Sequence, residues 1–204
     1  MLVVVGGHSR NIGKTSVVAG LIRKLKDRRW TALKITQYGN GVCSHHSMAC
    51  GCEPETDQPF ALSEEYEPNG TDTGRFLAAG AERSFWLRVP AGELTRAEAT
   101  VRKILGQGQN TIVESNSVLE LVRPDVFLML LDFSCQDFKA SSLRFMDRAD
   151  AFVVIDRGIN APMWEEIARG MWDHKPQFPV KPPNYVTPAL AGFVRSMLAL
   201  VSAR

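Results

Sequence analysis

Residues 6 to 16 constrain the fold of this chain more than any other segment. They read Gly-Gly-His-Ser-Arg-Asn-Ile-Gly-Lys-Thr-Ser and lie between the apolar run 2–5 and a helix-like stretch that starts at Thr15. A glycine-rich turn between a strand and a helix directs several backbone N–H groups and the positive end of the helix dipole toward one point. Phosphate groups bind to such turns. We therefore interpret residues 7 to 15 as a phosphate-binding loop.

The residues of this loop have separate expected roles. In motifs of this kind the lysine, here Lys14, reaches the β- and γ-phosphates, and the hydroxyl of Thr15 holds Mg²⁺. Arg10 is a candidate for stabilising charge on a transferred phosphoryl group, and a solvated loop arginine is the alternative interpretation. The usual spacing G-x-x-x-x-G-K-[ST] would place a glycine where His8 stands, so the loop is one residue longer. We expect nucleotide contacts from Gly7, His8, Ser9, Arg10, Asn11, Ile12, Gly13, Lys14, Thr15 and Ser16.

Apolar runs and helical periodicity alternate along the rest of the chain. Strands are predicted at 2–5, 31–36, 84–89, 110–114, 126–131 and 151–155. Helices are predicted at 15–26, 72–81, 94–105, 140–146, 162–171 and 188–202. This alternation is typical of a three-layer α/β fold with a mostly parallel central sheet flanked by helices. We expect one P-loop NTPase domain over residues 1–204, with an irregular insertion at about 37–70.

The composition of the chain argues against nucleic-acid and membrane partners. The 204 residues are 45% hydrophobic and 23% charged, and the formal net charge of +2 is too small to favour a nucleic-acid or membrane surface. No stretch approaches the roughly 18 apolar residues of a membrane span, and a predicted strand follows directly on the first residue. We therefore expect a cytoplasmic protein with neither a nucleic-acid nor a membrane partner.

Four segments resemble the dimeric P-loop NTPases, a family that includes dethiobiotin synthetase, the accessory GTPase of molybdopterin-guanine dinucleotide biosynthesis and the nickel-insertion GTPase of hydrogenase maturation. The loop 7–15 has the G-x₅-G-K-T length of the dethiobiotin synthetase loop, and 34–39 is similar to the Lys-Pro-x-x-x-Gly that follows the second strand there. Residues 72–81 resemble the Asp-Ser-x-x-x-x-x-Ala-Gly-Ala segment of the molybdopterin-linked GTPases, which are the closest members. Residues 112–114 parallel the Val-Glu-Gly that ends a strand in both.

The resemblance implies a homodimer and a magnesium site formed by Thr15, Asp72 and Glu114. Mg²⁺ prefers such oxygen ligands, and ligands of parallel sheets collect beyond the carboxyl ends of the strands, where Glu114 is predicted to lie. A surface carboxylate is the alternative for Glu114, and a helix cap is an equally good interpretation of Asp72. Lys34 ends a predicted strand and is expected to meet a nucleotide phosphate or an anionic substrate, unless it is an ordinary surface lysine.

A cluster of thiol and imidazole side chains lies in the insertion, at Cys43, His45, His46, Cys50 and Cys52. These side chains suit Zn²⁺, and Ni²⁺, Cu(I) or an iron–sulfur cluster accepts some of them. The spacing C-x-H-H-x₃-C-x-C is not a standard zinc-finger pattern. Buried cysteines beside exposed histidines, or a metal shared across a dimer axis, are the alternatives. We expect Zn²⁺ or another transition metal here.

The sequence does not determine which nucleotide base the protein binds. The Asn-Lys-x-Asp motif of GTP-specific relatives is absent, because the corresponding strand ends Val-Ile-Asp156-Arg-Gly. We expect base contacts from Asp156 or from the turn 182–185, so both ATP and GTP are candidate substrates. Residues 115–117 read Ser-Asn-Ser where dethiobiotin synthetase has a glycine-rich substrate loop, which argues against its substrate.

We expect a magnesium-dependent nucleoside triphosphate hydrolase or phosphotransferase, with Lys14, Arg10 and Lys34 as catalytic residues. The role that the resemblance implies is an accessory factor in molybdenum-cofactor or metallocentre assembly, with a client metalloenzyme or a cofactor-synthesis enzyme as partner. One alternative is an ATP-dependent synthetase or kinase that activates a small carboxylate or carbamate. Another is a nucleotide-gated metal-binding module with little turnover.

Overall fold

The structure is a computed structural model that describes residues 1–39, 58–159, 161–165 and 167–202. Its strands form an eight-stranded sheet in the order β3-β4-β2-β5-β1-β6-β7-β8. All neighbouring strands are parallel except β3 and β4, which confirms the predicted α/β fold with a mostly parallel sheet. The strands are β1 (Leu2–Gly7), β2 (Trp30–Tyr38), β3 (Ala61–Glu65), β4 (Arg83–Pro90), β5 (Asn110–Glu114), β6 (Val126–Asp132), β7 (Ala151–Ile155) and β8 (Gln177–Val180).

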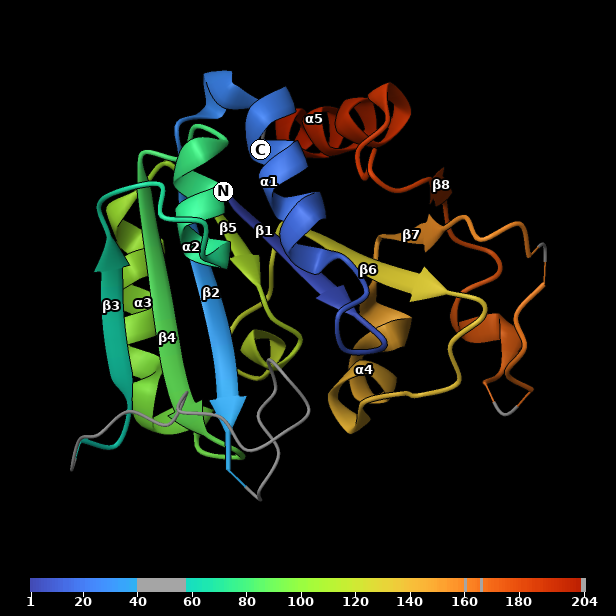
Figure 1. The fold of residues 1–204 in the computed structure, drawn as a ribbon, viewed down its shortest axis with the longest axis horizontal. Helices are drawn as coiled ribbons and strands as arrows, with labels where there is room; N and C mark the ends of the chain where they lie inside the picture. Colours follow the sequence, from blue (N-terminus) through green and yellow to red (C-terminus); the bar gives the residue numbers. More distant parts are fainter. Residues whose placement is uncertain (40–57, 160, 166, 203–204) are drawn as a thin grey trace.

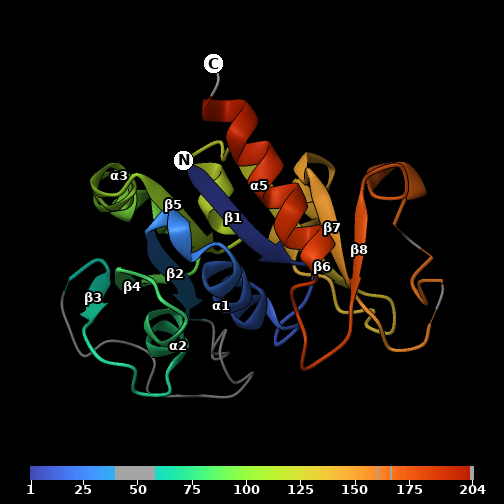
Figure 2. The same ribbon diagram turned by 90° about the horizontal axis from the view of Figure 1, so that it is seen from above.

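Helices cover both faces of the sheet, as Figures 1 and 2 show. One face packs against α1 (Lys14–Lys24), α2 (Asp72–Ala78) and α5 (Pro188–Ser202), and the other against α3 (Glu98–Gln107) and α4 (Ala140–Phe145). Short 3₁₀ turns complete the connections. They are η1 (Lys26–Arg28), η2 (Leu94–Ala97), η3 (Ser117–Glu120), η4 (Met146–Arg148) and η5 (Arg169–Met171).

Side-chain alternation along β1 divides the core into two layers. Val3 and Val5 face the cluster that contains α1 and α5, whereas Val4 faces the cluster that contains α3, and all three are fully buried. Because successive side chains of a strand point to opposite faces, a continuous apolar run fits a strand that is covered on both sides. β1 lies between β5 and β6 in the sheet. The loop that follows its carboxyl end therefore starts near the middle of the sheet, away from the edge strands.

The helix predicted at 162–171 is wrong. In the described part of this segment the regular structure is confined to η5. Trp164 packs edge-on against Trp172 with ring centroids 5.3 Å apart, and both indoles contact the ring of Phe133 just beyond β6. Burial of these aromatic side chains against the end of a central strand therefore outweighs the local helical preference.

Two edge strands escaped the sequence analysis. β3 lies within the segment 37–70 that we interpret as irregular. Its sequence Ala-Leu-Ser-Glu-Glu contains no apolar run, because it is an edge strand that is nowhere fully buried. β8 contains Pro179 and lies outside the strands predicted from the sequence. An edge strand tolerates proline because one side of its hydrogen-bonding ladder is unpaired. No helix in the described parts of the chain is long and apolar enough to cross a membrane.

Leu33→Ala tests the buried centre of the sheet. Leu33 on β2 is fully buried in the cluster shared with α3, so the substitution leaves a cavity and should lower the free energy of unfolding by about 3 kcal/mol. Leu200→Ala is the matched control, because Leu200 on α5 is 63% exposed and its truncation should cost less than about 0.5 kcal/mol. Chemical denaturation measures both values, and equal losses would contradict the assignment of β2 to the core.

Candidate functional site

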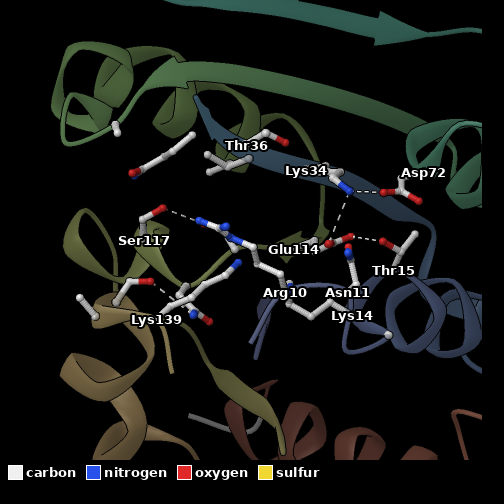
Figure 3. A pocket seen from close by; sticks show the side chains of 18 of the residues that line it. Arg10, Asn11, Lys14, Thr15, Lys34, Thr36, Asp72, Glu114, Ser117 and Lys139 are labelled. Carbon is white, nitrogen blue, oxygen red and sulfur yellow. Dashed lines mark hydrogen bonds and ion pairs between the residues drawn. The ribbon is translucent and has the colours of Figure 1, made fainter. Parts of the chain in front are cut away.

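A pocket of about 950 Å³ opens at the carboxyl ends of β1, β2 and β5 (Figure 3). Its walls come from the phosphate-binding loop, the end of β2, the end of β5 with the following segment 115–117, and the start of α4. The site residues that this pocket brings together from distant parts of the sequence are Arg10, Asn11, Gly13, Lys14, Thr15, Ser16, Lys34, Asp72 and Glu114. The predicted sites for phosphate, magnesium and catalysis therefore share one space.

The phosphate-binding loop turns sharply before α1. Gly13 has a φ of 100° and Asn11 a φ of 51°, both in the left-handed region that L-residues with a Cβ seldom adopt. A Cβ on Gly13 would also lie 2.4 Å from a ring carbon of Tyr185. The glycine before Lys14 is thus required for backbone conformation and for space. The turn leads directly into the first residues of α1.

Asn116 fastens this loop to the end of β5. Its side-chain oxygen accepts a hydrogen bond from the N–H of Gly7 at 2.9 Å, and its side-chain nitrogen donates to the Gly7 carbonyl at 2.9 Å. A Cβ at Gly6 would lie 2.2 Å from the Asn116 Oδ1 atom, so the amide fits only against a glycine. The sequence analysis noted Asn116 only as part of Ser-Asn-Ser. Its position directly after the strand that ends at Glu114 is the signal that could have identified it.

His8 occupies the position of the missing glycine, and its imidazole is directed away from the pocket. The side chain is fully buried, and its ring lies 4.5 Å from that of Phe138. The Nε2 atom lies 3.2 Å from the carbonyl oxygen of Cys135, and the N–H of Asp132 lies 3.4 Å from Nδ1. Burial lowers the pKa of His8, since it disfavours the imidazolium. The backbone N–H of His8 donates to the Leu130 carbonyl at 3.1 Å. His8 therefore supports the loop from inside, and neither its imidazole nor its N–H is directed to a nucleotide.

Lys34 bridges the two carboxylates predicted to bind magnesium. Its ammonium pairs with Asp72 and lies 3.6 Å from Glu114 Oε1. The Thr15 hydroxyl donates to Glu114 Oε2 at 2.8 Å. Two carboxylates and a hydroxyl around a bound cation are a donor set that fits Mg²⁺, which usually keeps several water ligands. Within the described residues no group of three or more histidine, cysteine, aspartate or glutamate side chains is placed to hold a metal ion, so this donor set depends on Thr15.

Positive charge gathers on the opposite side of the pocket. Figure 3 shows Lys139 entering from the start of α4 and Arg10 from the loop, both on the side of Ser117. Burial lowers the pKa of Lys139 to about 7, with further contributions from the charges of Lys14 and Arg10. Burial also lowers the pKa of Lys14, whose Nζ lies 3.4 Å from the Ser9 carbonyl oxygen. The sequence analysis missed Lys139, although a cation between a central strand and a helix is a recognisable signal.

The remaining predicted residues have different outcomes. Asp156 is exposed beyond β7, accepts a hydrogen bond from the N–H of Gly158 at 2.8 Å, and does not line the pocket. Tyr185, from the turn 182–185, does line it beside Gly13. Within the described chain, the structure therefore favours the turn over Asp156 as the nearer neighbour of the loop. The predicted metal ligands Cys43, His45, His46, Cys50 and Cys52 lie outside the described residues.

Known structures share this fold, although no protein-family model and no curated protein matches the sequence. HypB from Helicobacter pylori in complex with nickel is 14% identical, with 97% of this chain and 85% of that one aligned at a TM-score of 0.50. LpxK from Aquifex aeolicus in complex with ATP is 18% identical at a TM-score of 0.49, with 87% of this chain and 53% of that one aligned. This chain thus spans about half the length of LpxK. The similarity to HypB shows that the chain has the fold of P-loop NTPases.

Asn116→Ala tests the attachment of the phosphate-binding loop. Truncation leaves the buried N–H and C=O groups of Gly7 without these partners, so the free energy of unfolding should fall by about 1–3 kcal/mol. Asn184→Ala is the matched control, because Asn184 is exposed and its only described hydrogen bond comes from its backbone N–H. Thermal or chemical unfolding of the two variants gives the comparison. Equal stability of both would show that Asn116 does not hold the loop.

Proposed function

We propose that this chain is a magnesium-dependent nucleoside triphosphatase whose loop 7–15 holds the triphosphate. The observation that carries the proposal is the link between this loop and the carboxylate at the end of β5, made by the 2.8 Å hydrogen bond from Thr15 to Glu114. This hydrogen bond links the N-terminus of α1, where phosphate groups bind favourably, to a carboxylate at the end of β5, which is a suitable ligand for a metal ion. The cations that line the pocket add electrostatic attraction for a polyanion.

The residues of the pocket have separate roles in the proposed phosphoryl transfer. Backbone N–H groups of the loop and the ammonium of Lys14 hold the phosphates, and Thr15, Asp72 and Glu114 hold Mg²⁺. The bound magnesium ion would neutralise charge on the phosphate oxygens. Lys34 and Arg10 stabilise the charge that develops on the transferred group, and the partly buried pocket strengthens these interactions. In this chemistry positioning and electrostatics supply most of the rate, so the pocket needs no protein nucleophile.

The cellular role we propose is that of an accessory NTPase in molybdenum-cofactor or other metallocentre assembly. The sequence landmarks shared with the molybdopterin-linked GTPases support it, as does the cysteine and histidine cluster at 43–52. HypB, whose fold this chain shares, was solved with nickel. A homodimer and a client metalloenzyme or cofactor-synthesis enzyme complete the proposal, and the transition metal is Zn²⁺, Ni²⁺ or a similar ion.

Phosphoryl transfer to a small carboxylate or carbamate is a second candidate function. It is favoured by the extent of the pocket, which continues beyond the loop to η3 and α4 and is lined there by the cations Lys139 and Arg144. Simple hydrolysis needs only water at that end. A steady rate of triphosphate hydrolysis that small acids leave unchanged would argue against this candidate.

Lys14→Ala tests the proposed phosphate site. Losing a charged hydrogen-bond donor should weaken binding of magnesium ATP and magnesium GTP by about ten- to a hundredfold, because such bonds contribute about 1.5–3 kcal/mol. Lys24→Ala is the control on the same helix, since Lys24 is exposed and does not line the pocket. Calorimetric titration of both variants with both nucleotides also identifies the preferred base. Unchanged affinity in the Lys14 variant would refute the proposed site.

Metal analysis of the purified protein tests the metallocentre role. Elemental analysis should find Zn²⁺ or another transition metal in the wild-type chain and little in the variant with Cys43, Cys50 and Cys52 changed to Ser, because thiolates are ligands of such ions. Cys135→Ser, in the described part of the chain and outside the cluster, should retain the metal. Equal metal content in all three proteins would remove the support that the cluster gives. Bound metal with negligible triphosphate turnover would favour a metal-binding module instead.

A further inference from the structure

Three cations of the pocket, Arg10, Lys14 and Lys139, form no ion pair with a carboxylate among the described residues, and the ammonium of Lys14 lies 3.4 Å from the Ser9 carbonyl oxygen. Arg75 pairs with Asp72 at 3.5 Å, and Arg144 pairs with Glu120 at 3.0 Å. The ammonium of Lys34 lies between Asp72 and Glu114. In the described part of the chain no ion pair joins Arg10 or Lys139 to a carboxylate, although both line the same space. The carboxylates of Glu114 and Asp137 offset part of the positive charge around Lys139 without pairing with it, so this end of the pocket presents unpaired cations to an anion.

Lys139 is held in place by the phosphate-binding loop itself. The carbonyl oxygen of His8 accepts a hydrogen bond from the N–H of Lys139 at 2.9 Å and another from the Ser142 hydroxyl at 3.0 Å. The adjacent ring of Phe138 packs on the imidazole of His8. The backbone of Lys139 is thus fixed relative to the loop that would carry the phosphates, and its side chain enters the pocket from a defined position (Figure 3).

Serine hydroxyl groups line the same pocket as these cations. Ser115, Ser117 and Ser141 all line the pocket, and the hydroxyl oxygens of Ser115 and Ser117 lie 3.1 Å apart. Hydroxyls beside an ammonium and a guanidinium are suitable partners for the oxygens of a carboxylate or phosphate group. In Figure 3, Ser117 and Lys139 lie across the pocket from Thr15, Lys34 and Asp72, where the predicted magnesium ligands meet. This side of the pocket is consequently separate from the predicted metal site.

We propose that Arg10, Lys139 and Ser117 form a subsite for the oxyanion of a second substrate, a small molecule that carries a carboxylate or a phosphate monoester. This inference rests on the proposed function, because the γ-phosphate held by Lys14 defines the position next to which the subsite lies. The pKa of Lys139 is lowered mainly by burial and further by the charges of Lys14 and Arg10, and an anion brought into the pocket would counter both effects. The subsite would orient the acceptor for phosphoryl transfer.

Calorimetric titration of the triphosphate-bound protein tests the subsite. The protein is first saturated with Mg²⁺ and a non-hydrolysable β,γ-imido triphosphate, which fills the loop, and is then titrated with succinate or with glycerol 3-phosphate. We expect saturable binding of one probe, and Lys139→Met should weaken that binding at least about tenfold through loss of a charged hydrogen bond. Lys139→Arg should restore most of the affinity. The probe that binds identifies whether the natural group is a carboxylate or a phosphate.

Lys103→Met is the matched control, because Lys103 is exposed on α3 and does not line the pocket. Its affinity for the probe should equal that of the wild-type chain. The Lys139 variant should fold, since removing an ammonium that burial disfavours relieves an unfavourable charge, and circular dichroism checks this. If neither probe binds beside the analogue, or if both methionine variants bind equally well, the subsite is wrong and the proposed function stands. If the analogue itself does not bind, both proposals fail.

Discussion

The hydrogen bonds between the Asn116 side chain and the backbone of Gly7 are the interaction on which the rest of the site depends. They join the carboxyl ends of β1 and β5 at the centre of a sheet whose neighbouring strands there are parallel. The same strand ends then carry the phosphate-binding loop on one side and Glu114 on the other. A close approach of an amide to Gly6 makes this junction intolerant of larger side chains. Backbone geometry therefore positions the charges before any ligand arrives.

The charges themselves are arranged as two groups. Near α2, the ammonium of Lys34 pairs with the carboxylates of Asp72 and Glu114, and the hydroxyl of Thr15 donates a hydrogen bond to Glu114. Near α4, the cations Arg10 and Lys139 line the pocket with serine hydroxyls, and in the described part of the chain neither forms an ion pair with a carboxylate. A metal ion can replace Lys34 in the first group, whereas an anion would pair with the cations of the second group. A magnesium triphosphate beside an anionic acceptor supplies both ions, which is why the two proposals belong together.

Sequence patterns were sufficient where local chemistry decides the structure. The buried strands of the sheet centre read as apolar runs, and Gly13-Lys14-Thr15 reads as the end of a phosphate-binding loop. Sequence patterns did not predict the structure where tertiary contacts determine it. β3 and β8 are ordered by one neighbouring strand each, and the indole of Trp164 is held by the end of β6 rather than by a helix. Lys139 escaped notice for the same reason, because its hydrogen bond to His8 joins distant segments.

The crystal structure of the protein with Mg²⁺ and a non-hydrolysable triphosphate tests the central claim most directly. We expect the β- and γ-phosphates to lie in loop 7–15 and Lys14 to leave the Ser9 carbonyl for a phosphate oxygen. We expect Thr15 to bind the metal ion on the side of Glu114. Lys34 would then release at least one carboxylate. A nucleotide bound elsewhere, or a loop that keeps Lys14 on the Ser9 carbonyl with the triphosphate present, would contradict it.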